Sequence, residues 1–321
     1  MIAKLGRAYL HALRPRQWPK NLVVFAAPLF AFNLNPPALW SAVTAFGLFC
    51  AASSSFYLFN DIADVAADRQ HPVKCHRPSA AGLVRVPVAI AMALVLLATA
   101  LIGGWLKAPA LGLTLATYAG LQVAYNLKLK RVVILDIIVI AAGFVLRAIA
   151  GGVASGILPS VWFLLCTAML ALFLAIEKRK AELRLGQHGG KTRAVLQQYS
   201  ATLLARMEST VTTGAVMSYA IWSSGPQVNG ASTPWMMLTL PFVLYGIFRY
   251  QLLSDPLTPD HTAPQRTERP EEVLLTDRPL LITVGGWVLT VFAILWLKHQ
   301  GYLALISPYN ANIMMLMSPI N

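Results

Sequence analysis

Long apolar segments constrain this chain more than any other feature, because 57% of its 321 residues are hydrophobic and only 12% are charged. A helix needs about 20 mainly apolar residues to cross the roughly 30 Å hydrocarbon layer of a bilayer. In lipid, backbone groups have to bond within their own segment, so such runs are expected to be helices. We therefore predict an all-α, polytopic membrane protein with one integral membrane domain over residues 1–321 and about nine transmembrane helices. The nine stretches are residues 20–35, 38–59, 86–106, 109–126, 133–156, 159–177, 205–225, 234–253 and 280–298.

Two polar segments flank these stretches. Residues 1–19 place apolar side chains at helical spacing among basic ones, which predicts an amphipathic helix lying on the membrane surface. They lack the apolar core and cleavage site of a signal peptide. Residues 254–279 hold five prolines and are expected to form a mobile cytoplasmic loop.

The distribution of charge predicts the orientation. With a cytoplasmic amino terminus, all Lys and Arg residues except Lys107, Lys298 and the intramembrane Arg147 lie on or next to the inner side. The positive-inside rule thus explains the net charge of +13, so we expect membrane lipids as neighbours and no nucleic-acid partner. All 13 acids also gather on this side, which the rule does not explain. We predict a multi-pass plasma membrane protein with its active site facing the cytoplasm.

The cysteines indicate neither a disulfide framework nor a zinc site. Cys50, Cys75 and Cys166 form no CxxC pair, and the group of His71, Cys75 and His76 lacks a second pair of ligands.

The acids concentrate in the segment NDIADVAAD, which directly follows the second apolar stretch. If the helix continues through it, Asp61, Asp64 and Asp68 recur at i, i+3 and i+7 and share one face. Like charges at this spacing repel unless a cation lies among them, and hard oxygen ligands suit Mg²⁺ bound to substrate phosphates. We predict a catalytic magnesium site formed by these aspartates and the Asn60 amide.

Basic residues follow the acids in DRQHPVKCHRP. Lys74 and Arg77 are predicted to bind the outer oxygens of a metal-bound diphosphate. The alternative is a solvated helix end in which Asp64 pairs with Arg69 or Lys74.

The segment NDIADVAADRQHP resembles the NDxxDxxxD signature of the UbiA superfamily of intramembrane prenyltransferases, and the resemblance extends over nearly the whole chain. It implies a nine-helix fold around a central cavity open to the cytoplasmic side. Other segments resemble the members that join 5-phosphoribosyl diphosphate (PRPP) to a polyprenyl phosphate. They are LRPRQWPKN, DRQHPVKCHRP, YNLKLK, LRAIAGG, EKRKAEL and EEVLLTDRPL.

One position departs from the wider superfamily. Aromatic prenyltransferases of this fold carry a second aspartate-rich motif, usually DxxxD, between helices six and seven. Here the chain reads EKRKAELR, in which Lys178, Arg179 and Glu182 are candidate substrate ligands. A basic replacement suits a phosphate bound without a second magnesium ion. The alternative is an ordinary basic loop with a helix pair between Lys178 and Glu182.

Asp136 and Arg147 are charged residues in one apolar stretch, eleven positions apart and nearly on the same helix face. Charges at such depth face a polar cavity or a partner. The rise between them is about 16 Å, so they do not neutralise each other. We predict Lys130 or Tyr125 as the partner of Asp136 and a ligand phosphate for Arg147, with pairing to a neighbouring helix as the alternative.

Further hydrogen-bond donors lie at the same membrane edge. Tyr125 among them could alternatively anchor the helix at the membrane interface. The remaining candidate substrate-binding residues are Gln17, Lys20, Asn21, Tyr125, Asn126 and Lys130. The glycines at 143, 151 and 152 are equally consistent with close helix packing.

The resemblance implies Mg²⁺-dependent transfer of 5-phosphoribose from PRPP to a decaprenyl-like polyprenyl phosphate, with release of diphosphate. One alternative is a UbiA-type enzyme that moves a prenyl group from a prenyl diphosphate to an aromatic acceptor, against which the missing second DxxxD argues. Another is a transporter whose pathway Asp136 and Arg147 line, against which the lack of a visible inverted repeat argues. The sequence leaves open whether the protein is a monomer or a homo-oligomer.

Overall fold

The computed structural model describes residues 2–69, 74–187, 194–255, 273 and 276–305. Within this part of the chain the regular elements are helices. They are α1 (Ile2–Ala12), η1 (Pro15–Phe25), α2 (Ala26–Phe30), α3 (Pro36–Ala63), α4 (Val65–Arg69), η2 (Lys74–His76), α5 (Val86–Lys107), α6 (Pro109–Leu127), η3 (Leu129–Arg131), α7 (Leu135–Ser155), α8 (Val161–Gln187), η4 (Ala194–Gln198), α9 (Ala201–Ser223), η5 (Pro226–Val228), η6 (Pro234–Thr239), α10 (Leu240–Leu253), α13 (Arg278–His299) and α14 (Tyr302–Leu305).

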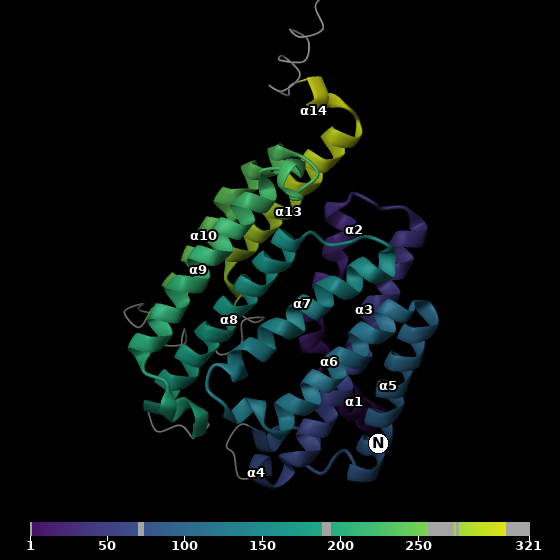
Figure 1. Ribbon diagram of the computed structural model, residues 1–321. Coiled ribbons are helices and arrows are strands. Elements are labelled where there is room, and N and C mark those ends of the chain that lie inside the picture. Colours follow the sequence, from purple (N-terminus) through teal and green to yellow (C-terminus); the bar gives the residue numbers. More distant parts are fainter. Residues whose placement is uncertain (1, 70–73, 188–193, 256–272, 274–275, 306–321) are drawn as a thin grey trace, which may run out of the picture.

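The long helices run up and down between two ends of the molecule (Figure 1). Short connections make consecutive helices neighbours, as in the packed pairs α5 with α6, α6 with α7, α7 with α8, and α8 with α9. One end, where α4 lies, collects the carboxyl ends of α3, α6 and α8 and the amino end of α7 (Figure 1). The opposite end holds α2 and α14. Residues distant in sequence therefore meet at the α4 end.

Six helical segments of the described chain are long and apolar enough to cross a membrane: 36–63, 86–107, 135–155, 161–184, 234–253 and 278–299. The stretches predicted at 109–126 and 205–225 form α6 and α9, which are long enough but more polar. The first predicted stretch differs in structure, because Pro19 lies inside a 3₁₀ helix that gives way to the five-residue α2. The count of nine transmembrane helices stays a prediction.

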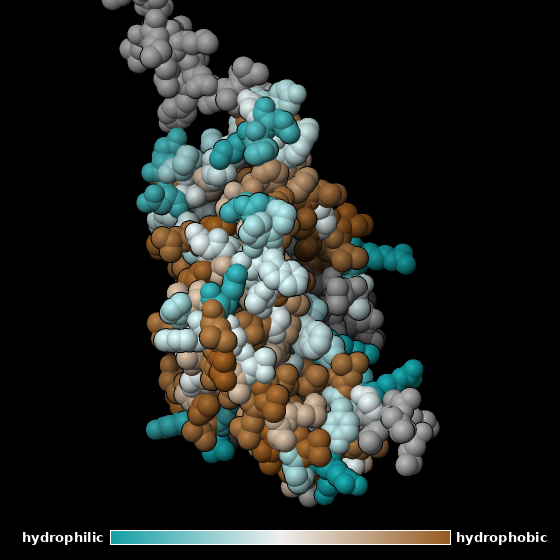
Figure 2. All heavy atoms as spheres, turned by 90° about the vertical axis from the view of Figure 1, so that its right-hand side faces the viewer, coloured by the Kyte–Doolittle hydropathy of each residue, from teal (hydrophilic) through white to brown (hydrophobic). Residues whose placement is uncertain are grey.

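The surface agrees with a lipid environment. Hydrophobic residues cover much of the face shown in Figure 2, and the most hydrophilic ones lie mainly toward its two ends. Large apolar side chains of α5 are exposed, including Leu94, Val95, Ile102 and Leu106. In a soluble protein such a continuous apolar face would promote association, whereas in a bilayer it contacts lipid.

Close helix packing explains one of the glycines. A Cβ atom on Gly151 of α7 would overlap the carbonyl oxygen of Val24, so only hydrogen fits between α7 and η1. The packing interpretation is confirmed for Gly151. Because the two backbones approach so closely, η1 packs directly against α7.

The two predicted polar segments, residues 1–19 and 254–279, differ from the structure or fall partly outside the described residues. The amino-terminal helix ends at Ala12 and not at residue 19, since the chain continues as η1 from Pro15. Most of the predicted loop 254–279 lies outside the described residues. Its last part is described: Asp277 caps α13 by accepting a hydrogen bond from the Leu280 amide, 2.9 Å away, and it pairs with Arg249.

Candidate active site

The acidic segment does not continue α3 as one helix. α3 ends at Ala63, Asp64 is its C-cap with φ −96° and ψ 3°, and α4 begins at Val65. The prediction of three carboxylates on one continuous helix face is therefore wrong. The break leaves Asp61 and Asp68 buried and Asp64 exposed.

Arg77 brings Asp61 and Asp68 together, and Arg14 pairs with Asp61. Arg77 Nη1 lies 2.7 Å from Asp68 Oδ2 and 3.3 Å from Asp61 Oδ1, so one guanidinium bridges both carboxylates. Asp61 Oδ1 also accepts a hydrogen bond from Arg14, which comes from the turn after α1. The predicted acidic cluster and the predicted basic residue Arg77 thus form one site.

The donor chemistry of this cluster fits a magnesium ion, because carboxylate and amide oxygens are its usual protein ligands. Two buried carboxylates already share one cationic group, the Arg77 guanidinium, and the half-buried Asn60 lies one position before Asp61. The described residues contain no ready-made group of three His, Cys, Asp or Glu side chains for a metal. Binding through a third carboxylate would require the exposed Asp64 to turn inward.

η1 carries the predicted residues of the LRPRQWPKN segment. Lys20 Nζ lies 2.5 Å from Gln17 Oε1, so these two candidates act as one polar pair. Trp18 Nε1 donates to Ser54 Oγ of α3 at 3.1 Å, and Ser54 Oγ donates to the Leu13 carbonyl at 2.9 Å. These bonds fix the start of η1 beside the last turns of α3.

Arg147 lies at the centre of a second, buried network. Its Nε donates to Asn21 Oδ1 at 2.6 Å, its Nη1 to the Gly143 carbonyl at 2.7 Å, and its Nη2 to the Tyr118 hydroxyl at 3.1 Å. None of these partners is acidic, and the guanidinium also lies over the Phe49 ring. Pairing with neighbouring segments, one of the two alternatives, is what the structure shows. A phosphate-binding role for Arg147 and Asn21 stays a prediction.

Asp136 has different partners from those predicted. Its Oδ2 accepts from Arg179 Nε at 2.8 Å and its Oδ1 from the Tyr199 hydroxyl at 2.7 Å. Lys130 and Tyr125 were therefore wrong as its partners, because α8 and the segment before α9 bring other donors against the start of α7. The Tyr199 hydroxyl also accepts from the amide of Ile134, whose φ of 71° is rare for a β-branched residue. Burial and the hydrogen bond to Asp136 raise the pKa of Tyr199, so the phenol stays protonated and donates.

The position of the second motif lies on the last turns of α8. Arg179 pairs with both Asp136 and Glu182, and its side chain is 1% exposed. Its Nη2 is buried and has no hydrogen-bond partner in the described chain. Glu182 thus pairs with Arg179, the residue that follows Lys178, and a helix pair of Lys178 with Glu182 stays a prediction.

Glu177, the other acid of this motif, pairs with a lysine of the same helix. Lys180 Nζ lies 2.8 Å from Glu177 Oε1 and 2.5 Å from Glu208 Oε2 of α9. Gln251 of α10 completes the group by donating to Glu208 at 2.8 Å. This cluster ties α8, α9 and α10 together at the α4 end.

The remaining candidates lie at the same end. Tyr125 and Asn126 are half-buried in the last turn of α6, and Lys130 is half-buried in η3. Tyr125 interacts electrostatically with Arg179. The Lys74 side chain and Glu271 lie outside the described residues.

Several site residues were missed from the sequence. Arg14 belongs to the LRPRQWPKN segment, yet nothing in the pattern distinguishes it from Arg16. Tyr118 and Tyr199 resemble interfacial or core tyrosines until the fold places them on charged partners. For Glu208 a signal existed, since it is an acid inside a predicted apolar stretch.

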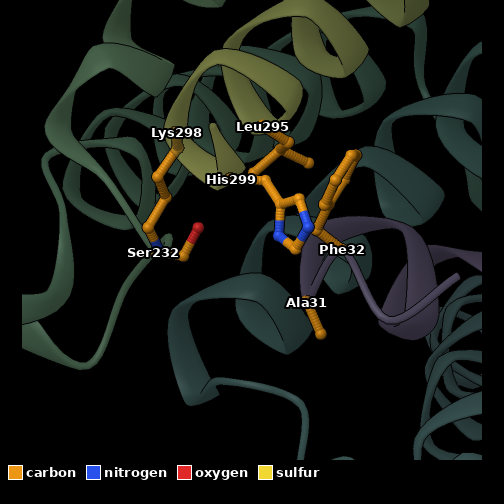
Figure 3. Close-up of a pocket in the computed structure, with 6 residues that line it drawn as sticks. All are labelled: Ala31, Phe32, Ser232, Leu295, Lys298 and His299. Atoms are coloured by element: carbon orange, nitrogen blue, oxygen red, sulfur yellow. The ribbon is translucent and has the colours of Figure 1, made fainter. Parts of the chain in front are cut away.

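A cavity of about 320 Å³ lies at the opposite end of the molecule, between the end of α2 and the end of α13 (Figure 3). The ring of His299 lies tilted against that of Phe32, with ring centroids 5.4 Å apart and ring planes at 52°. Its lining residues are Ala31, Phe32, Ser232, Leu295, Lys298 and His299. None of them belongs to the acidic cluster, so this cavity is separate from the candidate active site.

The chain is similar to one family of known proteins over most of its length. Residues 21–266 match the UbiA prenyltransferase family. Decaprenyl-phosphate phosphoribosyltransferase of Mycobacterium tuberculosis is 37% identical over 298 residues, covering 91% of this chain and 95% of the relative. The protein of the same name from Corynebacterium glutamicum is 39% identical over 297 residues, covering 89% of this chain and 86% of the relative.

A solved structure supports the fold. A UbiA homolog from Archaeoglobus fulgidus, bound to DMAPP and Mg²⁺, has a TM-score of 0.66 to this chain at 18% identity. The match covers 89% of this chain and 98% of that one. At this identity the likeness concerns the fold alone. Together with the long apolar helices and the full-length relatives, the family match establishes that this chain is a multi-pass membrane protein that belongs to the UbiA prenyltransferase family.

Proposed function

We propose that this chain transfers the 5-phosphoribosyl group of PRPP to a polyprenyl phosphate and releases diphosphate. Relatives that match it over about nine-tenths of its length carry the name decaprenyl-phosphate phosphoribosyltransferase. The bond between C1 of the ribose and the diphosphate breaks, and an oxygen of the lipid phosphate forms the new bond to C1. The lipid phosphate is already anionic at neutral pH, so the reaction needs no strong general base.

The observation that favours phosphoribosyl transfer over prenyl transfer is the state of the second motif. Glu177 pairs with Lys180, and Glu182 pairs with Arg179. Each acid of this motif therefore has a cation of the same helix beside it, where a DxxxD motif would offer carboxylates alone to a second metal. The guanidinium of Arg179 keeps one buried donor, Nη2, without a partner in the described residues, and a phosphate oxygen would satisfy it.

The acidic cluster would hold the diphosphate end of PRPP. Asp61, Asp64 and Asp68, with Asn60, are the residues that would bind Mg²⁺. A bound Mg²⁺ would neutralise negative charge on the leaving diphosphate. Arg77 lies among these carboxylates and would donate to the remaining phosphate oxygens, because a guanidinium binds phosphate through two parallel hydrogen bonds.

The other candidates would orient the substrates. Lys74, Lys178, Arg179 and Lys130 supply positive charge, whereas Gln17, Lys20, Tyr125 and Asn126 supply further polar contacts at the same end. The apolar helix faces would leave the polyprenyl tail in lipid while its phosphate reaches this end. Such positioning of two reactants accounts for a large part of an enzyme's rate. We place this end at the cytoplasmic face of the plasma membrane, where PRPP arrives from water.

The test uses purified protein in nanodiscs with Mg²⁺, ribose-labelled PRPP and decaprenyl phosphate. We expect label to enter the lipid fraction and one diphosphate to be released for each lipid labelled. Reactions without lipid phosphate or with EDTA serve as controls. The proposal is overturned if the protein leaves PRPP intact and instead consumes a prenyl diphosphate with an aromatic acid. A series of polyprenyl phosphates measures the preferred chain length.

A further inference from the structure

The buried carboxylates of the candidate active site are reached through two arginines. The side chains of Asp61 and Asp68 are 3% and 6% exposed, whereas those of Arg14 and Arg77 are 27% and 30% exposed. The guanidinium groups therefore lie on the more open side of the cluster. An ion that arrives from water meets them before it meets the carboxylate oxygens.

The position of Arg14 is built into the fold. Arg14 has φ 54° and ψ 59°, a left-handed conformation that residues with a side chain rarely adopt. The preceding carbonyl, that of Leu13, accepts a hydrogen bond from Ser54 of α3. The Arg14 guanidinium packs over the Tyr57 ring, 5.0 Å from its centroid, and donates to Asp61. Three separate contacts with α3 thus hold this arginine on the carboxylate.

The charges of this group disfavour a divalent ion that arrives alone. Asp61 and Asp68 carry two negative charges, and Arg14 and Arg77 already balance them with two positive ones. A lone divalent ion would have to displace a guanidinium from Asp61 or share its oxygens against like-charge repulsion. A diphosphate changes this balance, because it offers the displaced guanidinium groups new oxygen acceptors.

We propose that Arg14 and Arg77 act as exchangeable counter-ions that make the divalent metal and the diphosphate enter the site together. Metal alone binds weakly, since the guanidinium groups hold the carboxylates. With a diphosphate present, the guanidinium groups turn to its oxygens and release the carboxylates to the metal. Arg14 thereby contacts the diphosphate of the substrate as well as Asp61. This inference rests on the proposed function and adds an order of assembly to it.

The test measures metal retention and not turnover. Equilibrium dialysis of the purified full chain with radioactive Mn²⁺ is performed with and without inorganic pyrophosphate. Counts on the protein side in excess of the buffer side report bound metal, because free metal pyrophosphate equilibrates across the membrane. We expect wild type to bind Mn²⁺ at least about tenfold more tightly when pyrophosphate is present.

Two variants and a matched control test the role of the arginines. Arg14→Gln and Arg77→Gln should each tighten the binding of Mn²⁺ alone by about threefold to tenfold and reduce the gain from pyrophosphate. Arg16→Gln, which removes the same charge from an exposed residue of the same segment, should leave both values unchanged. Arg14→Lys and Arg77→Lys keep the charge, so Mn²⁺ alone should bind as weakly as to wild type. The gain from pyrophosphate should be kept only in part, because an ammonium group cannot form the two parallel hydrogen bonds of a guanidinium. Thermal unfolding of each variant confirms that it is folded.

The possible failures are distinguishable. If wild type binds Mn²⁺ alone as tightly as with pyrophosphate, and neither glutamine variant tightens it, the counter-ion inference is overturned and the magnesium site stands. If Mn²⁺ is not retained under either condition, the inference fails together with the metal assignment. Binding that persists in Asp61→Asn places the metal elsewhere and overturns both.

Discussion

The pairing of Arg179 with Asp136 and Glu182 makes a quantitative prediction about stability. The three groups are buried, and their charges sum to minus one. Arg179→Leu leaves two carboxylates near each other without their cation. Removing one partner from a buried ion pair destabilises a protein by about 3–5 kcal/mol. We expect Arg179→Leu to lower the free energy of unfolding by an amount in this range.

Asp136→Asn should lower the free energy of unfolding by less than Arg179→Leu does, because Arg179 still pairs with Glu182 and the asparagine oxygen still accepts a hydrogen bond. The loss of one hydrogen bond to a charged group is worth about 1.5–3 kcal/mol. The double variant should be less destabilised than the sum of the two, since Asp136→Asn removes one of the carboxylates that Arg179→Leu leaves unpaired. We expect a coupling energy of about 1–3 kcal/mol.

SDS titration of the protein in mixed micelles, followed by tryptophan fluorescence, measures these free energies of unfolding. Arg206→Leu is the matched control, because it removes an arginine that is exposed on α9. Its effect should stay within about 0.5 kcal/mol. Equal effects of Arg179→Leu and Arg206→Leu, or strict additivity in the double variant, would refute the buried ion network.

Three further predictions concern other parts of the chain. The hydrogen bond from Arg249 lowers the pKa of Asp277 below its ordinary value of 3.8. The stability that Asp277 contributes is therefore full above pH 3.8 and is lost as the pH falls through the lowered pKa. Melting temperatures of wild type and Asp277→Asn should differ at about pH 7 and converge as the pH falls through that lowered pKa, and a constant difference would contradict this. If the α4 end faces the cytoplasm, a membrane-impermeant maleimide should label the protein in inside-out vesicles and not in right-side-out ones. The label reports on the half-buried Cys75, because Cys50 and Cys166 are buried. The reverse pattern would place the α4 end on the outer side. Asp61→Ala and Asp68→Ala should each reduce phosphoribosyl transfer by at least about 100-fold while the protein stays folded, and full activity in both would exclude the metal assignment.

The helical class and the gathering of acids at one end could be predicted from the sequence. Apolar runs of about 20 residues permit little besides helices in a bilayer, and charged residues are excluded from lipid. The acidic signature, with its basic neighbours, was likewise readable, because its residues lie close together along the chain. Asp61, Asp68 and Arg77 do form one cluster in the structure.

Which charges pair could not be predicted, because the partners come from distant parts of the chain. Asp136 meets Arg179 across 43 residues, and Arg147 meets Asn21 across 126. Such contacts depend on how α7 packs against α8 and η1, which the period of a single helix does not specify. The placement of Arg14 on Asp61 has the same origin, since it depends on how the turn after α1 packs against Ser54 and Tyr57 of α3.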